Sequence, residues 1–249
     1  TYLKAFDPIR ELFADQNTAK ANGYTPAYFS FNVDGGRCDN CKGEGYITVE
    51  MQFMADIHLT CEECGGNRFK KDILKVTYQD KTIADVLEMT VDEALGFFEG
   101  HNAITQQLQP LADVGLGYIK LGQPSINLSG GEAQRIKLAS FLTRQATDEP
   151  ILFIFDEPTT GLHFHDIHNL LTAFNALADR GHTILIVEHN LDIVKSADWV
   201  IDLGTDGGEA GGHLLYEGDP PGLMANTASH TGAYLKAKVE HERALQASQ

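Results

Sequence analysis

Positive charge is scarce in this chain. Its 249 residues contain 19 Lys and Arg against 35 Asp and Glu, which gives a formal net charge of −16 at pH 7. A field of that sign repels a polyanion, so any contact with nucleic acid must depend on a local group of basic side chains. The composition therefore excludes a protein that binds nucleic acid through its overall charge.

Long hydrophobic runs are missing as well. No apolar stretch approaches the roughly 20 residues that span a bilayer, and no signal-peptide pattern opens the chain. We therefore expect a cytoplasmic protein that has no membrane segment. The hydrophobic content of 43% is ordinary, and 249 residues are enough to bury a full core in one large or two modest domains.

Cysteine is limited to two pairs, Cys38-x2-Cys41 and Cys61-x2-Cys64. This spacing is typical of a zinc site with four thiolate ligands, which leaves no open position for a substrate and is therefore structural. A disulfide framework is the alternative, but it needs an oxidising compartment that nothing in the sequence indicates. Between the pairs, the alternation over residues 46–59 predicts a hairpin.

A short basic cluster follows the second cysteine pair. Residues 36–81 contain seven basic and eight acidic residues, a net charge of −1, so this region as a whole is no binding surface. Only Arg68, Lys70 and Lys71, around one phenylalanine, form a compact basic-aromatic group that would contact DNA. A solvated turn explains the same residues equally well.

The segment Leu128-Ser-Gly-Gly-Glu-Ala-Gln-Arg135 organises the chain. Ser129 suits the N-cap of a helix, because its hydroxyl can accept a hydrogen bond from an unpaired amide of the first turn. Gly130 and Gly131 remove side chains there, so a phosphate could approach the backbone amides at the positive end of the helix. A Ser-capped helix after a glycine turn is the plainer interpretation of this segment taken alone.

Two apolar runs are each followed by side chains that can take part in catalysis. Residues 151–155 lead directly into Asp156 and Glu157, and a second run leads to His189. Each run predicts a strand buried on both faces of a parallel sheet, with its polar residues at the carboxyl end, where open α/β sheets bind ligands. The two acids alone would also fit the N-cap of a helix.

The remaining pattern predicts mainly helices. Asp7 before a proline suggests a helix N-cap, Thr90 is a plausible cap for the helix that follows it, and Trp199 is expected in the core. Helices are predicted over residues 6–15, 82–88, 91–99, 108–118, 166–178 and 192–197, and further strands over 199–203 and 213–217.

In this order and spacing, the motifs resemble the signature, Walker B and switch histidine of an ABC-type ATPase. The cysteine pairs narrow the resemblance to the UvrA family, the DNA-damage-recognition ATPases of bacterial nucleotide excision repair. The other segments that carry this resemblance are Ile83-Ala-Asp-Val-Leu-Glu-Met-Thr90, Asp113-Val-Gly-Leu-Gly-Tyr118, Asp156-Glu-Pro-Thr-Thr-Gly-Leu-His163 and Val187-Glu-His-Asn190.

The resemblance implies an α/β fold of the ABC-type P-loop NTPase class. It would combine a helical signature subdomain, an inserted zinc module with four cysteines, and an ATPase core. The implied boundaries are 1–32 and 73–145 for the helical subdomain, 33–72 for the zinc module, 146–235 for the core and 236–249 for a C-terminal tail.

The resemblance also implies roles for single residues. Glu157 would orient the attacking water and His189 would contact the γ-phosphate of ATP, while Asp156 would help to hold Mg²⁺. The other residues expected to contact ATP or Mg²⁺ are Ser129, Gly130, Gly131, Glu132, Gly161 and His163. The implied cofactors are structural Zn²⁺, ATP and Mg²⁺.

The implied partners are damaged double-stranded DNA, a UvrB-like protein and a second UvrA-like subunit. One departure is that these 249 residues contain no G-x4-G-K-[ST] sequence, the loop that cradles phosphates. We expect that loop upstream of Thr1, and expect this chain alone not to hydrolyse ATP. The alternatives are a zinc-stapled module that docks DNA or protein on a non-catalytic ATPase scaffold, and a UvrA-like paralogue used in drug resistance.

Overall fold

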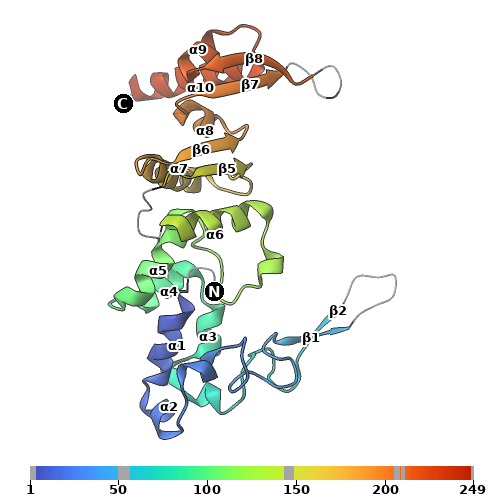
Figure 1. Ribbon diagram of the computed structural model, residues 1–249, viewed down its shortest axis with the longest axis vertical. Helices are drawn as coiled ribbons and strands as arrows, with labels where there is room; N and C mark the ends of the chain where they lie inside the picture. Colours follow the sequence, from blue (N-terminus) through green and yellow to red (C-terminus); the bar gives the residue numbers. More distant parts are fainter. Residues whose placement is uncertain (1–3, 50–56, 143–148, 205–207, 209–210, 248–249) are drawn as a thin grey trace. The chain divides into compact units, whose positions relative to one another are not determined.

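Two compact units divide the chain. A computed structural model describes residues 4–49, 57–142, 149–204, 208 and 211–247. The first unit comprises residues 1–128 and 136–144, and the second comprises residues 129–135 and 145–249 (Figure 1). Helix α6 (Gly130–Leu142) therefore begins in the second unit and ends in the first.

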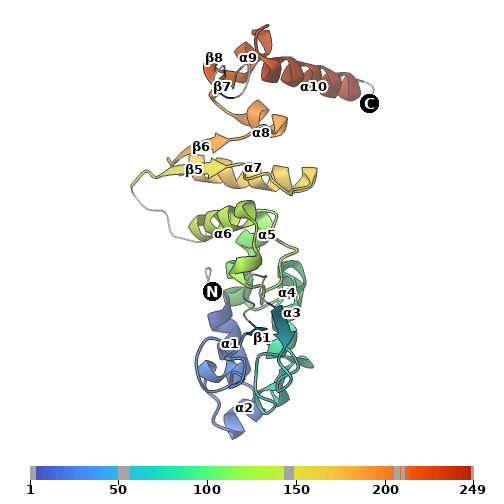
Figure 2. The same cartoon turned by 90° about the vertical axis from the view of Figure 1, so that its right-hand side faces the viewer.

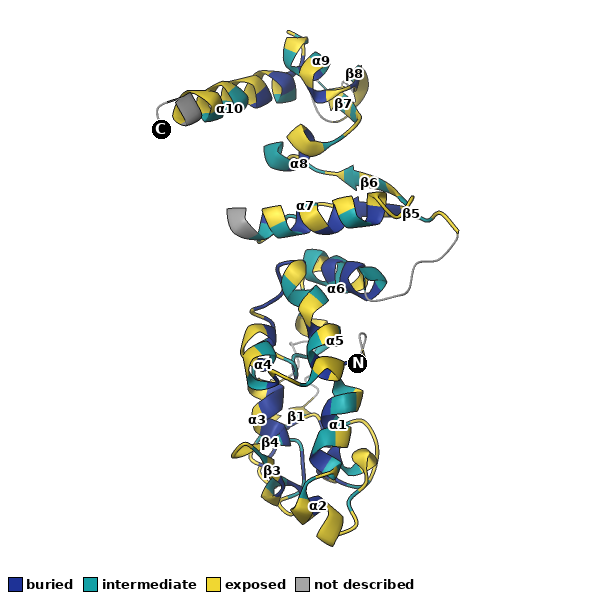
Figure 3. Ribbon diagram, turned by 90° about the vertical axis from the view of Figure 1, so that its left-hand side faces the viewer, coloured by how far each residue is buried: buried dark blue, intermediate teal, exposed yellow. Residues whose placement is uncertain are grey.

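The first unit is mainly helical, with short β-hairpins. Its core is an apolar cluster that includes Ile9, Phe13, Phe29, Phe69 and Phe98, each fully buried. Figure 3 shows buried stretches along α1 and α3. The elements of this unit before α6 are α1 (Phe6–Ala14), α2 (Asn17–Ala21), η1 (Pro26–Phe29), β1 (Tyr46–Val49), β2 (Ile57–Thr60), η2 (Ile73–Lys75), β3 (Thr77–Tyr78), β4 (Lys81–Thr82), α3 (Ile83–Glu88), α4 (Val91–Phe97), α5 (Asn102–Asp113) and η3 (Ser125–Asn127).

Reciprocal caps begin two of these helices. The Thr82 hydroxyl accepts the amide of Asp85 before α3, and the Thr90 hydroxyl accepts the amide of Glu93 before α4. Each acidic side chain accepts the amide of its threonine in return, so two unpaired donors are satisfied at each start. The predicted cap at Thr90 is confirmed.

The cap of the first helix and the bounds of α5 differ clearly from the sequence predictions. Asp7 lies inside the first turn of α1, where it pairs with Arg10, and Ala5 occupies the N-cap position, so the predicted Asp7 cap was wrong. Helix α5 spans Asn102–Asp113 where the pattern predicted 108–118. Gly115 has a φ of +74°, and the amide of Leu116 returns to the carbonyl of Leu111 at 2.8 Å, which ends the helix earlier.

The predicted hairpin between the cysteine pairs is present in its described part. Strands β1 and β2 pair antiparallel, with Tyr46 opposite Thr60 and Val49 opposite Ile57. The intervening residues 50–56 lie outside the described residues. Val49, Ile57 and Leu59 are between 39% and 54% exposed, so these residues of the described strands bury little apolar surface.

The second unit holds the strands that carry the ATPase-like motifs. β5 (Leu152–Asp156) and β6 (Thr183–Val187) pair in parallel, with Asp156 opposite Val187. Helix α7 (Phe164–Ala178) lies along them in Figures 1 and 2, and the rings of Phe155 and Phe174 are 5.0 Å apart. The remaining elements are α8 (Leu191–Ser196), β7 (Val200–Gly204), β8 (His213–Gly218), α9 (Pro220–Ala225) and α10 (His230–Ala247).

Only one face of this parallel pair is covered within the described chain. Phe153 and Phe155 are buried, whereas Leu152 and Ile154, which point the other way, are 59% and 64% exposed. The prediction of a strand buried on both faces was therefore wrong for β5, and it was also wrong for β6, where Leu185 and Val187 are 46% and 55% exposed. Trp199, which was expected in the core, is 63% exposed. In the described part of the chain, no helix is long and apolar enough to cross a bilayer.

Candidate metal centre and nucleotide half-sites

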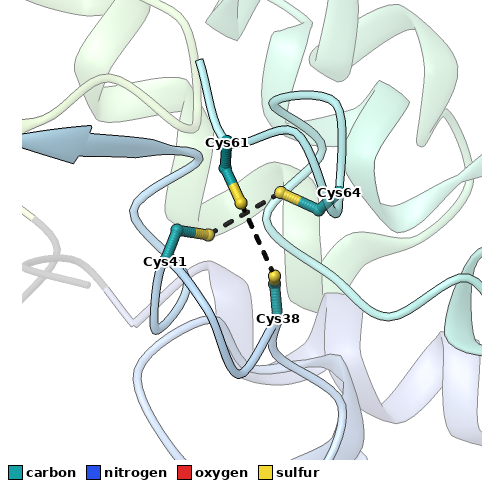
Figure 4. A group of neighbouring side chains, drawn as sticks. All are labelled: Cys38, Cys41, Cys61 and Cys64. Atoms are coloured by element: carbon teal, nitrogen blue, oxygen red, sulfur yellow. Dashed lines mark hydrogen bonds between the residues drawn. The ribbon is translucent and has the colours of Figure 1, made fainter. Parts of the chain in front are cut away.

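The four cysteines come together in one buried cluster. Their sulfur atoms all lie within 4.8 Å of one another, and each residue is at most 6% exposed (Figure 4). The closest sulfurs belong to different pairs, with Cys38 3.9 Å from Cys61 and Cys41 3.7 Å from Cys64. An ion with four thiolates at about 2.3 Å sets its sulfurs roughly 3.8 Å apart, so the cluster fits one tetrahedral metal ion.

Two tight turns bring backbone amides toward the sulfurs. The residues after Cys41 and Cys64 turn back through glycines at positive φ, and the amide of Gly45 donates to the sulfur of Cys41 at 3.3 Å. At Gly43, φ is +90° and an added Cβ would lie 2.0 Å from the carbonyl oxygen of Phe31. Only glycine allows the chain to pass that close.

The thiols have unequal proton affinities without a metal. The pKa of Cys61 is lowered to about 7, chiefly by the backbone amide of Cys64. Burial raises the pKa of Cys64 to about 12 and also raises the pKa of Cys38. Because metal ligation requires thiolates, a bound cation would supply the charge that lets all four sulfurs lose their protons.

The basic cluster of Arg68, Lys70 and Lys71 is less available for contact with DNA than its sequence suggests. Phe69 is fully buried, so its ring cannot stack on a base. The Lys70 ammonium lies 2.9 Å from the Asp39 carboxylate, and the Arg68 guanidinium lies over the ring of Phe31 at 5.5 Å. Lys71 is exposed. Of the three basic residues predicted to contact DNA, Lys71 is thus the one whose side chain lies outside these pairings.

Ser129 begins α6 with a reciprocal cap. Its hydroxyl accepts the amide of Glu132 at 3.2 Å, while the Glu132 carboxylate accepts the amide of Ser129 at 2.7 Å. A Cβ added at Gly130 would meet nothing within 4 Å, so the backbone there is open to an approaching ligand. The predicted N-cap is confirmed, and the first turn of α6 presents bare backbone beside it.

Glu157 and His189 meet at the carboxyl ends of β5 and β6. Oε1 of Glu157 lies 3.8 Å from Nδ1 of His189, and the two side chains are 57% and 82% exposed. Asp156 lies beside them as the last residue of β5. An exposed carboxylate and imidazole at this sheet edge can orient a water molecule and contact an anionic substrate.

The residues after β5 form a strained turn. Glu157 has a φ of +45°, a region that a residue with a side chain rarely adopts. Its amide donates to Val187 at 2.9 Å, and its carbonyl accepts the amide of Thr160 at 3.2 Å. The same turn runs on to Gly161, at a φ of +76°, and to His163, which precedes α7 without a side-chain cap.

Two α6 side chains that the sequence analysis did not single out hold this turn. Gln134 donates to the carbonyl of Asp156 at 3.1 Å and accepts its amide at 3.3 Å. Arg135 is 1% exposed and donates to the carbonyl of Pro158 at 2.8 Å. Both residues belong to the segment that begins at Leu128, and their place in that motif is what could have identified them from the sequence.

Glu188 is a third side chain that the sequence analysis left without a role. Its side chain is 2% exposed, although the neighbouring His189 is open to solvent. Burial raises the pKa of Glu188, but hydrogen bonds from Thr159, Asn190 and His189 outweigh burial, and the pKa lies below its ordinary value. The sequence feature that could have identified Glu188 is its place directly after an apolar strand.

Comparison with known proteins identifies relatives of the whole chain. UvrABC system protein A of Aquifex aeolicus is 55% identical over 242 residues, which cover 97% of this chain and 26% of the relative. The same protein of Streptomyces coelicolor is 50% identical over 248 residues, or 100% of this chain and 24% of the relative. The chain is homologous to UvrABC system protein A. No protein-family model matches it.

A solved structure of UvrA2 from Deinococcus radiodurans matches with a TM-score of 0.83 and 46% identity, over 95% of this chain and 29% of that one. The predicted resemblance and the predicted fold class, an ABC-type ATPase fold, are thus confirmed. The chain spans about a quarter of the length of the UvrA proteins that it matches.

Proposed function

We propose that this chain is part of a DNA-damage-recognition ATPase of nucleotide excision repair, an excinuclease subunit of the UvrA type that works in the cytoplasm. The supporting observation is the pairing of Glu157 with His189 at the ends of two parallel strands, on a turn held by the signature helix α6. A carboxylate and an imidazole so placed suit the orientation of water for attack on ATP.

The ATP contacts divide into two half-sites on one chain. The capped start of α6, from Ser129 to Glu132, offers backbone amides and a helix N-terminus to a γ-phosphate. Asp156 would help to hold Mg²⁺, Glu157 would position the water, and His189 would contact the γ-phosphate. Gly161 and His163 would line the passage between two nucleotide domains, which requires a second UvrA-like subunit or domain.

The cysteine cluster would hold one structural Zn²⁺, because four buried thiolates leave no position for a substrate. Binding of a structural zinc contributes on the order of 10 kcal/mol of apparent free energy, so a chelator should unfold at least the hairpin. Elemental analysis that finds no metal in freshly purified, reduced protein would contradict the assignment.

Damaged double-stranded DNA and a UvrB-like protein complete the proposal as partners. We assign residues 33–72 to a zinc module, 1–32 and 73–145 to a helical signature subdomain, and 146–235 to an ATPase core followed by a tail. In this scheme ATP hydrolysis is coupled to DNA binding, and Lys71, an exposed basic residue within the zinc module, would contact the DNA.

A zinc-stapled docking module is the second candidate. It is favoured by one sequence observation, the absence of a G-x4-G-K-[ST] loop from these 249 residues. In that case the ATPase fold would serve only as a scaffold.

Substitution of Glu157 separates the two candidates. In a full-length protein that joins this segment to a phosphate-cradling loop, Glu157→Gln should keep ATP binding and lower turnover sharply, because it removes the group that positions water and leaves the phosphate contacts. Glu217→Gln on β8, an exposed acid, is the matched control. Turnover that survives in Glu157→Gln would favour the docking module.

A further inference from the structure

Glu188 is a buried carboxylate between two exposed catalytic candidates. Its side chain is 2% exposed, whereas the side chains of Glu157 and His189 are 57% and 82% exposed. In the described residues it forms no ion pair with Lys or Arg. A carboxylate withdrawn from water in this way must be satisfied by hydrogen bonds.

Four hydrogen bonds satisfy it, two at each oxygen. Oε1 accepts the amide of Thr159 at 2.9 Å and also its hydroxyl. Oε2 accepts the amide of His189 at 2.9 Å and the amide of Asn190 at 3.1 Å. One carboxylate therefore ties the turn after β5 to the loop after β6.

This tie fixes both ends of the Glu157–His189 pair. Thr159 lies two residues after Glu157, whose backbone sits at a φ of +45°. A non-glycine residue stays in that region only where its surroundings hold it. The backbone of His189 is held by the second carboxylate oxygen. Glu188 thus adds a side-chain link between the turn and the histidine loop to the backbone bond that runs from Glu157 to Val187.

We propose that Glu188 is a positioning residue that holds Glu157 and His189 at a working separation by bridging Thr159 to the histidine loop. The inference rests on the proposed ATPase function. Glu188 does not touch the substrate itself and acts through the two backbones that it joins.

The donors and acceptors of the four hydrogen bonds determine which substitutions test the proposal. All four partners are donors, so a glutamine in place of Glu188 keeps the size but presents an NH₂ group to two of them. Thr159→Val removes one donor and keeps the shape of the side chain, while Thr159→Ser keeps the hydroxyl. Glu240→Gln, at an exposed position on α10, is the matched control.

The measurement is steady-state ATP turnover in the full-length protein, with the folded fraction of each variant checked by thermal melting. Glu188→Gln should lower kcat about 10- to 100-fold, the cost of a misplaced reacting group. KM for ATP should change less than kcat, because the phosphate contacts proposed for the start of α6 do not depend on Glu188, although the one proposed for His189 does. Thr159→Val should lower kcat in the same direction, and Thr159→Ser and Glu240→Gln should behave as wild type.

A purely structural role predicts another pattern. Glu188→Gln would then melt at a lower temperature, and its folded fraction would turn over at the wild-type kcat, which overturns the proposal. If Glu188→Gln does not fold, the Thr159 pair decides, since equal kcat for Val and Ser also overturns it. Failure of the ATPase function itself is distinguishable, because wild type and Glu157→Gln would then be equally inactive.

Discussion

Glu157 has an unfavourable backbone conformation that its neighbours hold in place. Its positive φ is unfavourable for a side-chain-bearing residue, and the cost is offset by bonds on every side of the turn. Gln134 and Arg135 hold the backbone from α6, and Glu188 holds it from the loop after β6. The carboxylate of Glu157 itself is 57% exposed and lies 3.8 Å from Nδ1 of His189, which suits the substrate contact that we propose for it.

Glu188 also predicts a pH dependence of stability. Its pKa in the folded protein lies below the ordinary value of 4.5, so the stabilisation is fully present above pH 4.5 and is lost as the pH falls through the folded pKa. Glu188→Gln should therefore melt below wild type at pH 7, and the difference should shrink below pH 4.5. Melting curves from pH 3 to pH 8 measure it, with Glu240→Gln as the control. A difference that stays constant with pH would contradict the assignment.

The sequence predicted the residues of the candidate site better than it predicted the residues that hold them in place. The clustering of the four cysteines, the Ser129 cap and the proximity of Glu157 to His189 all follow from motif spacing and strand ends. The supports could not be found in this way. Glu188 and Thr159 are 29 positions apart, and only the parallel register of β5 with β6 brings them together.

At the scale of elements, the turns that carry the cysteines decide whether the metal centre forms. Gly43→Ala would place a methyl group 2.0 Å from the carbonyl of Phe31, in addition to the strain of a positive φ. Gly23→Ala is the matched control, because Gly23 has a φ of +68° and nothing lies within 4 Å of its added Cβ.

We expect Gly23→Ala to lose about 1–2 kcal/mol, the cost of the left-handed backbone alone. Gly43→Ala should lose more and should retain less metal after purification, because the turn must move away from Phe31. Urea unfolding and metal content per chain measure both effects. Equal losses of stability and of metal in the two variants would show that the close approach of Gly43 to Phe31 contributes to neither.

The ends of helices and the burial of strand faces were predicted less well from the sequence. Helix α5 ends where Gly115 turns the chain, but one glycine among several near that point gave no unique stop. The outer face of β5 is a different case. Apolar residues at Leu152 and Ile154 correctly indicate a face that favours burial, yet the described chain does not cover it. Hydrophobicity predicts which surface avoids water and does not name what packs on it.

At the scale of the whole molecule, the net charge of −16 makes the proposed DNA contact a local matter. Lys70 is paired with Asp39, whereas Lys71 is exposed. In the full-length protein, Lys71→Ala should weaken DNA binding and flatten its dependence on salt by about one charge. Lys70→Ala should have the smaller effect. Binding titrations over a series of salt concentrations compare them, and an unchanged slope for Lys71→Ala would leave this turn without a role in DNA contact.

The exposed Trp199 has a consequence for following the assembly of the protein in solution. It is the only tryptophan in the chain, it directly precedes β7, and it is 63% exposed beside Ile201, Leu203 and Leu214, which are also largely exposed. The indole emission of this chain therefore comes from one ring in contact with water and should lie at long wavelength. Any protein segment that packs on this face would remove that water and shift the emission to the blue. The chain thus carries its own optical reporter of whether the second unit stands alone or is covered.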